Sequence, residues 1–170
     1  MRSVSTLLLI ATLALAGCGY ELIRYRSAGG ELRTVAVRPL RNDAMDPGYG
    51  REVTDAILRE ILRRGALRIV RDPADADLVL SGRVKPIQTR ASSFDSIVLA
   101  LEYEVFVGLE LTVVQRDGEE RALPASTLRA SERYTTSADV EALRKNREEA
   151  LRRVATLLAS RVHDTLSEGF

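Results

Sequence analysis

The chain has 170 residues, of which 45% are hydrophobic and 29% charged, and its formal net charge is +1 at pH 7. This length and composition indicate a single compact domain and exclude a disordered protein. The balance of 25 Lys and Arg residues against 24 Asp and Glu residues gives no sign of nucleic-acid binding. One cysteine and one histidine exclude an internal disulfide and metal sites built from several Cys or His ligands.

Residues 1–17 are predicted to be a lipoprotein signal peptide. The apolar stretch from Val4 to Ala16, about 13 residues, is too short to span a bilayer and suits a signal-peptide core. It leads into Leu15-Ala16-Gly17-Cys18, which matches the lipobox of bacterial lipoproteins, where cleavage leaves Cys18 as an acylated N-terminus. A short signal peptide followed by a buried free cysteine is the alternative. The residue after the cysteine is Gly19. Since Asp at this position would retain a lipoprotein at the inner membrane, Gly favours location at the outer membrane.

After Cys18 the chain is predicted to divide into a short lipidated tether and one folded domain. Residues 18–33 have mixed polarity, a Gly29-Gly30 pair and no sustained period, as is typical of a linker. Residues 34–170 carry the periodic patterns and are assigned to a single domain. Its predicted elements are a strand at 34–40, a helix at about 49–64 followed by Gly65, a strand at 67–70, strands at 78–85 and 97–113, a strand interrupted by Pro124, and a helix from about Ser137 onward.

The strongest pattern in the chain is a strict alternation that predicts a long strand with one buried face. Every odd position from 97 to 113 is apolar, whereas the even positions include Glu102 and Glu104. Residues 78–85 alternate in the same way. We therefore expect these two segments to pair as a hairpin whose connection is residues 91–96.

This hairpin register predicts which side chains face each other across the sheet. On the core face, Val84 is expected opposite Tyr103. On the outer face the register brings opposite charges together, with Arg83 opposite Glu104, Lys85 opposite Glu102 and, from the last strand, Arg133 also opposite Glu102. The two glutamates are therefore predicted to belong to a charge ladder rather than to a catalytic carboxylate pair.

The last segment is predicted to be a helix of about 28 residues, long enough to back a whole sheet. Ser137 is a good N-cap residue, and Asp139 and Glu141 would lie in the first turn. Taken together, the elements predict an α+β fold of two helices packed on one face of a four- or five-stranded mixed sheet, in the order β-α-β-β-β-β-α.

The sequence carries no motif for an enzyme or a cofactor. It contains no G-x-S-x-G, Walker, G-x-G-x-x-G or H-E-x-x-H pattern, so neither a cofactor nor a metal ion is expected. His163 is interpreted as a surface-lying helix residue rather than a general base. The prediction is a protein that is not an enzyme. The remaining alternative, a small lipid-anchored hydrolase, would need His163 in a cleft with a serine and a carboxylate.

The order of several short motifs resembles the lipopolysaccharide-assembly lipoprotein family, the lipoprotein subunit of the outer-membrane lipopolysaccharide translocon. The resemblance covers nearly the whole chain after the signal peptide. The motifs are Leu15-Ala-Gly-Cys18-Gly19-Tyr20, Val35-Ala-Val-Arg-Pro39 with Asn42, Glu52-Val-Thr-Asp-Ala-Ile57, Ala76-Asp-Leu-Val-Leu-Ser-Gly-Arg-Val84 and Leu166-Ser-Glu-Gly-Phe170.

The resemblance implies a lipid-anchored, periplasm-facing outer-membrane protein that plugs a large β-barrel partner, supports its assembly and binds lipopolysaccharide. The family's basic binding positions, near the tip of the long hairpin and near the start of the last helix, fall here on Arg90 and on Arg144 or Lys145. Phosphates suit guanidinium groups, and all but two of the cations in this chain are arginines. The alternatives to these roles are that Arg90 is a solvated turn residue and that Lys145 is the partner of Glu141.

A second class of protein shares part of this pattern. Accessory outer-membrane lipoproteins of secretion or peptidoglycan synthesis have a similar opening strand and helix, so residues 35–84 do not discriminate between the classes. The long alternating strand at 97–113 and the extended terminal helix favour the lipopolysaccharide-assembly interpretation.

Overall fold

The computed structural model describes residues 33–94 and 100–169. The predicted signal peptide, Cys18 and residues 18–32 of the predicted tether lie outside this part of the chain. So do residues 95–99, at the end of the long hairpin. Nothing in the fold therefore tests the lipidation of Cys18.

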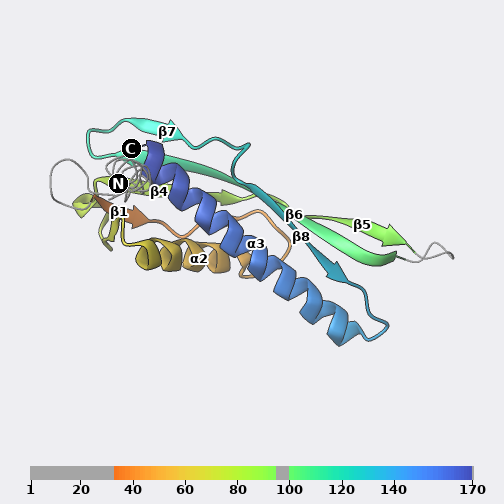
Figure 1. Cartoon of the computed structure of the whole chain (residues 1–170). Coiled ribbons are helices and arrows are strands. Elements are labelled where there is room, and N and C mark those ends of the chain that lie inside the picture. Colours follow the sequence, from red (N-terminus) through yellow and green to blue (C-terminus); the bar gives the residue numbers. More distant parts are fainter. Residues whose placement is uncertain (1–32, 95–99, 170) are drawn as a thin grey trace, which may run out of the picture.

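The described residues form two helices and a mixed sheet, which confirms the predicted α+β class (Figure 1). The sheet has eight strands rather than four or five, because several strands are only two or three residues long. The elements are β1 (Thr34–Val37), β2 (Arg41–Asn42), α2 (Tyr49–Arg64), β3 (Arg68–Ile69), the 3₁₀ turn η2 (Pro73–Asp75), β4 (Leu78–Val84), β5 (Gln88–Phe94), β6 (Ala100–Gln115), β7 (Glu120–Ala122), β8 (Arg129–Thr135) and α3 (Val140–Gly169).

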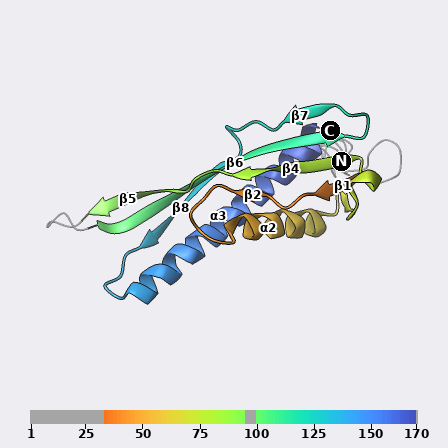
Figure 2. The same ribbon diagram turned by 180° about the vertical axis from the view of Figure 1, so that it is seen from behind.

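The long strand β6 organises the whole sheet. Along one of its edges it pairs with β4 and then β5, and along the other with β7 and then β8, all antiparallel. Beyond β4 the sheet continues through β1 to β3 with parallel pairing. Figures 1 and 2 show an elongated molecule, in which β1 and the C-terminus lie at one end and the β5–β6 hairpin and the start of α3 lie at the other.

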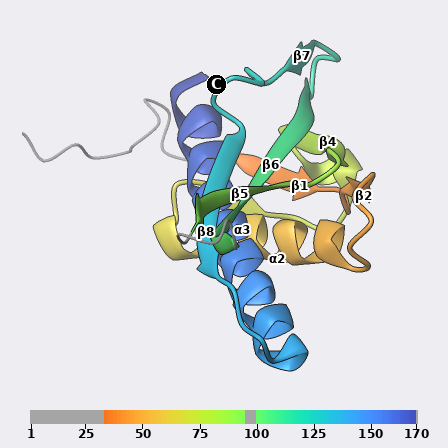
Figure 3. The same ribbon diagram turned by 90° about the vertical axis from the view of Figure 1, so that its right-hand side faces the viewer.

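The core lies between the sheet and the two helices (Figure 3). The odd positions of β6 from Val105 to Val113 are buried, as the alternation predicts, and the even positions are only partly covered. The predicted buried face does not extend to Leu101, which is 49% exposed. We call the face formed by these even positions the outer face of the sheet. On α2, the i, i+4 stripe of Val53, Ile57 and Ile61 is fully buried, and Gly65 ends the helix in a left-handed conformation as predicted.

The predicted hairpin register is wrong. Val84 lies opposite Leu109 instead of Tyr103, and Arg83 lies opposite Glu110 instead of Glu104. The reason is that the chain continues past Pro86 into a separate strand, β5, which takes up the first half of β6. Because the displacement is six residues, an even number, the same faces stay buried and Arg83 still meets a glutamate.

The last strand also pairs differently from the prediction. Arg133 lies opposite Glu104 rather than Glu102. Between β7 and β8 the chain makes a turn at Pro124, whose carbonyl accepts hydrogen bonds from the backbone N–H and the hydroxyl of Thr127. Pairing with β6 stops at this turn and resumes beyond it, so the interruption predicted from Pro124 is confirmed and the extra residues change the register.

The N-terminus of α3 is capped by Asp139 rather than by the predicted Ser137. The Asp139 carboxylate accepts the backbone N–H groups of Glu141 and Ala142, whereas the Ser137 hydroxyl accepts that of Asp139 itself. Both residue types favour the N-cap position, so composition alone could not separate two candidates two residues apart.

His163 is buried, with 3% of its surface exposed, instead of lying on the surface as predicted. It lies on α3 near Glu60 and Arg64 of α2 and beside Asp164 and Ser167. Its Nδ1 atom is 3.4 Å from the Ser167 hydroxyl, and its Nε2 atom has no hydrogen-bond partner among the described residues. Burial, assisted by the Arg64 charge, lowers the pKa of His163 below its ordinary 6.5 despite the opposing carboxylates.

We expect the protein to lose stability as the pH falls from about 7.5 to about 5.5. The unfolded chain takes up a proton near the ordinary pKa of 6.5, whereas the buried imidazole resists it, so the unfolded state binds more protons in this window. Urea midpoints at both pH values, compared with those of His163→Leu, check this. Since His163 is the only histidine, an equal pH dependence in the variant would contradict the assignment.

Candidate functional site

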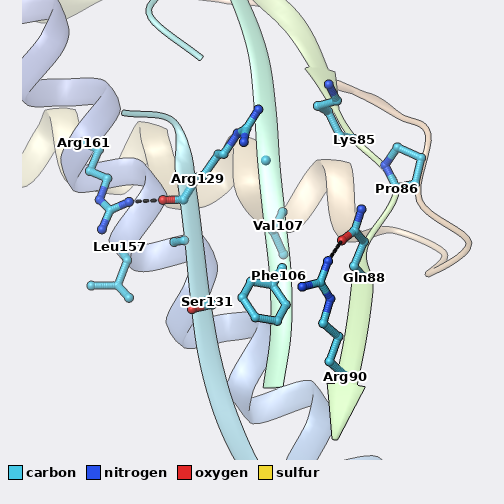
Figure 4. A pocket seen from close by; sticks show the side chains of 12 residues that line it. Lys85, Pro86, Gln88, Arg90, Phe106, Val107, Arg129, Ser131, Leu157 and Arg161 are labelled. Atoms are coloured by element: carbon cyan, nitrogen blue, oxygen red, sulfur yellow. Dashed lines mark hydrogen bonds between the residues drawn. The ribbon is translucent and has the colours of Figure 1, made fainter. Parts of the chain in front are cut away.

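A groove of about 610 Å³ opens on the outer face of the sheet, where β5, β6 and β8 lie side by side (Figure 4). Leu157 and Arg161 of α3 complete it beyond the edge of β8. Its lining combines four cations with apolar groups and includes no carboxylate among the described residues. The lining residues are Lys85, Pro86, Gln88, Arg90, Phe106, Val107, Gly108, Arg129, Ala130, Ser131, Leu157 and Arg161.

The floor of the groove follows from the alternation of β6. Because Val105, Val107 and Leu109 point into the core, Phe106 and Gly108 face the groove. Gly108 lies between two cross-strand neighbours: it accepts a backbone hydrogen bond from Lys85 (2.9 Å) and is paired with Arg129. A Cβ atom at Gly108 would lie 3.6 Å from Lys85 Cδ and 3.7 Å from Arg129 Cγ, so the glycine leaves a space that the side chains around it do not fill.

The cations of the groove differ in how far their charge is already neutralised. Lys85 forms an ion pair with Glu110 at 2.9 Å. The Arg90 guanidinium stacks 5.2 Å from the centre of the Phe106 ring and donates to the Gln88 amide at 3.1 Å. Arg161 donates to the backbone carbonyl of Arg129.

Three of these four cations thus have no carboxylate partner within the described part of the chain. Arg90 and Arg161 contact only neutral groups, and the Arg129 side chain has no ion pair or hydrogen bond there. Guanidinium groups without a carboxylate partner, beside apolar surface, suit an amphipathic anion, because charge-assisted hydrogen bonds to phosphate or carboxylate are short and strong.

The comparison with known families decides what kind of lipoprotein this is. The family model described as "LptE: Lipopolysaccharide-assembly" matches residues 32–166. The chain belongs to the LptE family. It is therefore a lipopolysaccharide-assembly lipoprotein associated with a membrane, as the motifs predict.

Solved structures agree with this fold. Rare lipoprotein B from Shewanella oneidensis aligns with a TM-score of 0.58 at 17% identity, over 80% of this chain and 95% of that protein. A minor lipoprotein from Acinetobacter baumannii aligns with a TM-score of 0.53 at 17% identity, over 82% of this chain and 93% of that one. At this identity the likeness concerns the fold alone. No curated protein sequence matches the chain.

Of the basic residues that the LptE resemblance implies, Arg90 lines the groove and the other two do not. Arg90 lies in the middle of β5 rather than at the hairpin tip, because β5 extends to Phe94. Arg144 and Lys145 lie in the first turns of α3. There Arg144 pairs with Glu141 at 2.5 Å and also with Glu148, and Lys145 is 3.9 Å from Glu141. The hydrogen bond from Arg144 holds the pKa of the Glu141 carboxyl below its usual range.

Sequence reasoning missed Gly108, Arg129 and Arg161 as lining residues of the groove. The one signal in the sequence was Gly108, a glycine among the even positions of β6, which could have indicated a gap on the outer face. It was not recognised because the predicted register placed Lys85 opposite Glu102 instead of beside Gly108.

No group of His, Cys, Asp and Glu side chains at 33–94 or 100–169 could hold a metal ion. No helix in the described part of the chain is long and apolar enough to cross a membrane.

Proposed function

We propose that this LptE-family chain is a non-enzymatic outer-membrane lipoprotein that plugs and supports the assembly of a large β-barrel lipopolysaccharide translocon. It helps to deliver lipopolysaccharide to the outer leaflet. Acyl chains on Cys18 hold it to the membrane with its folded domain facing the periplasm. The observation that carries the proposal is the family match, which spans most of the domain.

The groove supports direct contact with lipopolysaccharide. This glycolipid presents phosphates, and Arg90 offers a guanidinium that no carboxylate among the described residues neutralises. Arg144 and Lys145, on the first turns of α3, are proposed as a second contact. Their side chains are 53% and 69% exposed, so a phosphate could replace the carboxylates that they now contact.

The geometry around His163 argues against the hydrolase alternative. A catalytic base needs one ring nitrogen on the nucleophile and the other on the orienting carboxylate. Here the Ser167 hydroxyl (3.4 Å) and the Asp164 carboxylate (3.7 Å) both approach Nδ1, and the imidazole of His163 is itself buried. The described residues therefore offer no Ser–His–Asp arrangement around this histidine.

Depletion of the chain in its own bacterium tests the proposal. We expect the assembled barrel partner to fall and lipopolysaccharide at the cell surface to decrease several-fold, and expression of the wild-type chain should restore both. Surface labelling of lipopolysaccharide and quantification of the folded barrel are the measurements. Unchanged surface lipopolysaccharide together with a defect in secretion or peptidoglycan synthesis would contradict it.

A further inference from the structure

We infer that the groove binds one phosphate of lipopolysaccharide through Arg129 and Arg161 together with Arg90, and holds one adjoining acyl chain over Gly108. This inference rests on the proposed function and deepens it. It adds residues from β8 and α3 and a specific part of the ligand to a contact that the resemblance places only on Arg90, Arg144 and Lys145.

The arrangement of charges favours a phosphate at the groove. Arg90, Arg129 and Arg161 come from three different elements, β5, β8 and α3, and line the same space without a carboxylate among the described lining residues. Several exposed arginines elsewhere in the domain are paired with carboxylates, Arg144 with Glu141 and Glu148 for example, and what distinguishes Arg90, Arg129 and Arg161 is that all three line one groove. A group of unpaired guanidiniums beside a hydrophobic floor lacks an anion of its own, and phosphate accepts several guanidinium hydrogen bonds at once.

The uncharged part of the lining favours an acyl chain beside that phosphate. Phe106, Pro86 and Leu157 line the groove, and the apolar side chain of Leu157 on α3 is 41% exposed. Gly108 leaves the floor open between them. The volume of about 610 Å³ lies within the range of small-ligand sites, so the groove takes one chain and one phosphate rather than a whole multi-chain glycolipid.

The test uses the full lipidated chain in mild detergent, titrated with lipopolysaccharide, with deacylated lipopolysaccharide that keeps its sugars and phosphates, and with phosphatidylglycerol. The first variant is the double substitution Arg129→Gln and Arg161→Gln, which removes charge. The second is Gly108→Leu, which fills the floor without touching a cation. Matched controls are Arg152→Gln, an exposed arginine of α3 outside the groove, and Thr112→Leu, at an even position of the same strand. Thermal unfolding verifies that each variant is folded.

We expect the double variant to weaken binding of both lipopolysaccharide forms by about ten-fold or more, since it removes charge-assisted hydrogen bonds. Gly108→Leu should weaken binding of intact lipopolysaccharide by a similar factor and leave binding of the deacylated form unchanged. The controls should bind like the wild type.

Three outcomes would overturn the inference while the proposed function stands. The folded double variant could bind lipopolysaccharide with wild-type affinity, or Gly108→Leu could lose affinity equally for the intact and the deacylated form. The third outcome is that the wild-type chain binds phosphatidylglycerol as tightly as lipopolysaccharide. Failure of the wild-type chain to bind lipopolysaccharide at all would instead overturn the direct contact on which the inference rests.

Discussion

Replacing Gly82 by alanine is expected to destabilise the fold by about 3–5 kcal/mol, among the largest effects of any single substitution. Gly82 lies in β4, on the face that packs toward the core, with a φ of +154°. A Cβ atom there would clash with the backbone oxygen of Glu110 and would lie 2.9 Å from the Cα atom of Leu111 on the neighbouring strand β6. The clash can be relieved only if β4 and β6 move apart. Urea denaturation measures the resulting loss in the free energy of unfolding.

Gly118→Ala is the matched control for this effect. Gly118, in the turn before β7, also has a positive φ, +92°, but nothing lies within 4 Å of where its Cβ atom would be. Its substitution should therefore cost only the backbone strain, about 1 kcal/mol. If both variants lost the same stability, the close approach of β4 and β6 at Gly82 would not be the cause.

Removal of the acyl chains from Cys18 is expected to release the protein from the membrane almost completely. Each buried methylene contributes about 0.8 kcal/mol, so acyl chains dominate the attachment. The experiment exports Cys18→Ala behind an ordinary cleavable signal peptide in place of residues 1–17, so that no uncleaved leader holds the chain. The fraction of protein in the membrane pellet is measured by fractionation.

Ser27→Ala, in the same predicted tether and with the native signal peptide, should stay in the membrane fraction. Retention of exported Cys18→Ala in the membrane would show that the folded domain or its partner holds the chain there without acylation, and would contradict the anchor assignment.

Local patterns in the sequence predicted the elements well, because each depends on residues close together in the chain. The α2 helix runs from Tyr49 to Arg64 as expected, since its apolar stripe and its terminal Gly65 define it. The buried face of β6 was predicted from alternation alone. The extent of α2 and the buried face of β6 do not depend on how distant strands pair.

Pairing between distant strands was not predictable to the same extent. Glu104 and Glu110 are six residues apart on β6, so either could face Arg83 with the same side chains buried. Alternation specifies which face is buried, but a shift by an even number of residues leaves it unchanged. The register depends on where the chain leaves β4 for β5, at Lys85 and Pro86. The alternation of apolar residues does not specify that position.

Most of the groove could not be predicted either, because its lining depends on the same strand register. Arg90 was found because of the family resemblance, but the position of Gly108 between Lys85 and Arg129 exists only in the correct register. Arg161 reaches the groove from α3, more than thirty positions along the chain from Arg129, and only the packing of α3 along β8 brings them together.

The most direct test of the proposed role is recovery of the tagged, lipidated chain from its native outer membrane in mild detergent, with identification of the proteins that accompany it. We predict one large β-barrel protein at equal stoichiometry, with lipopolysaccharide in the same complex. Recovery of a peptidoglycan synthase or a secretion channel in place of the barrel would contradict the account.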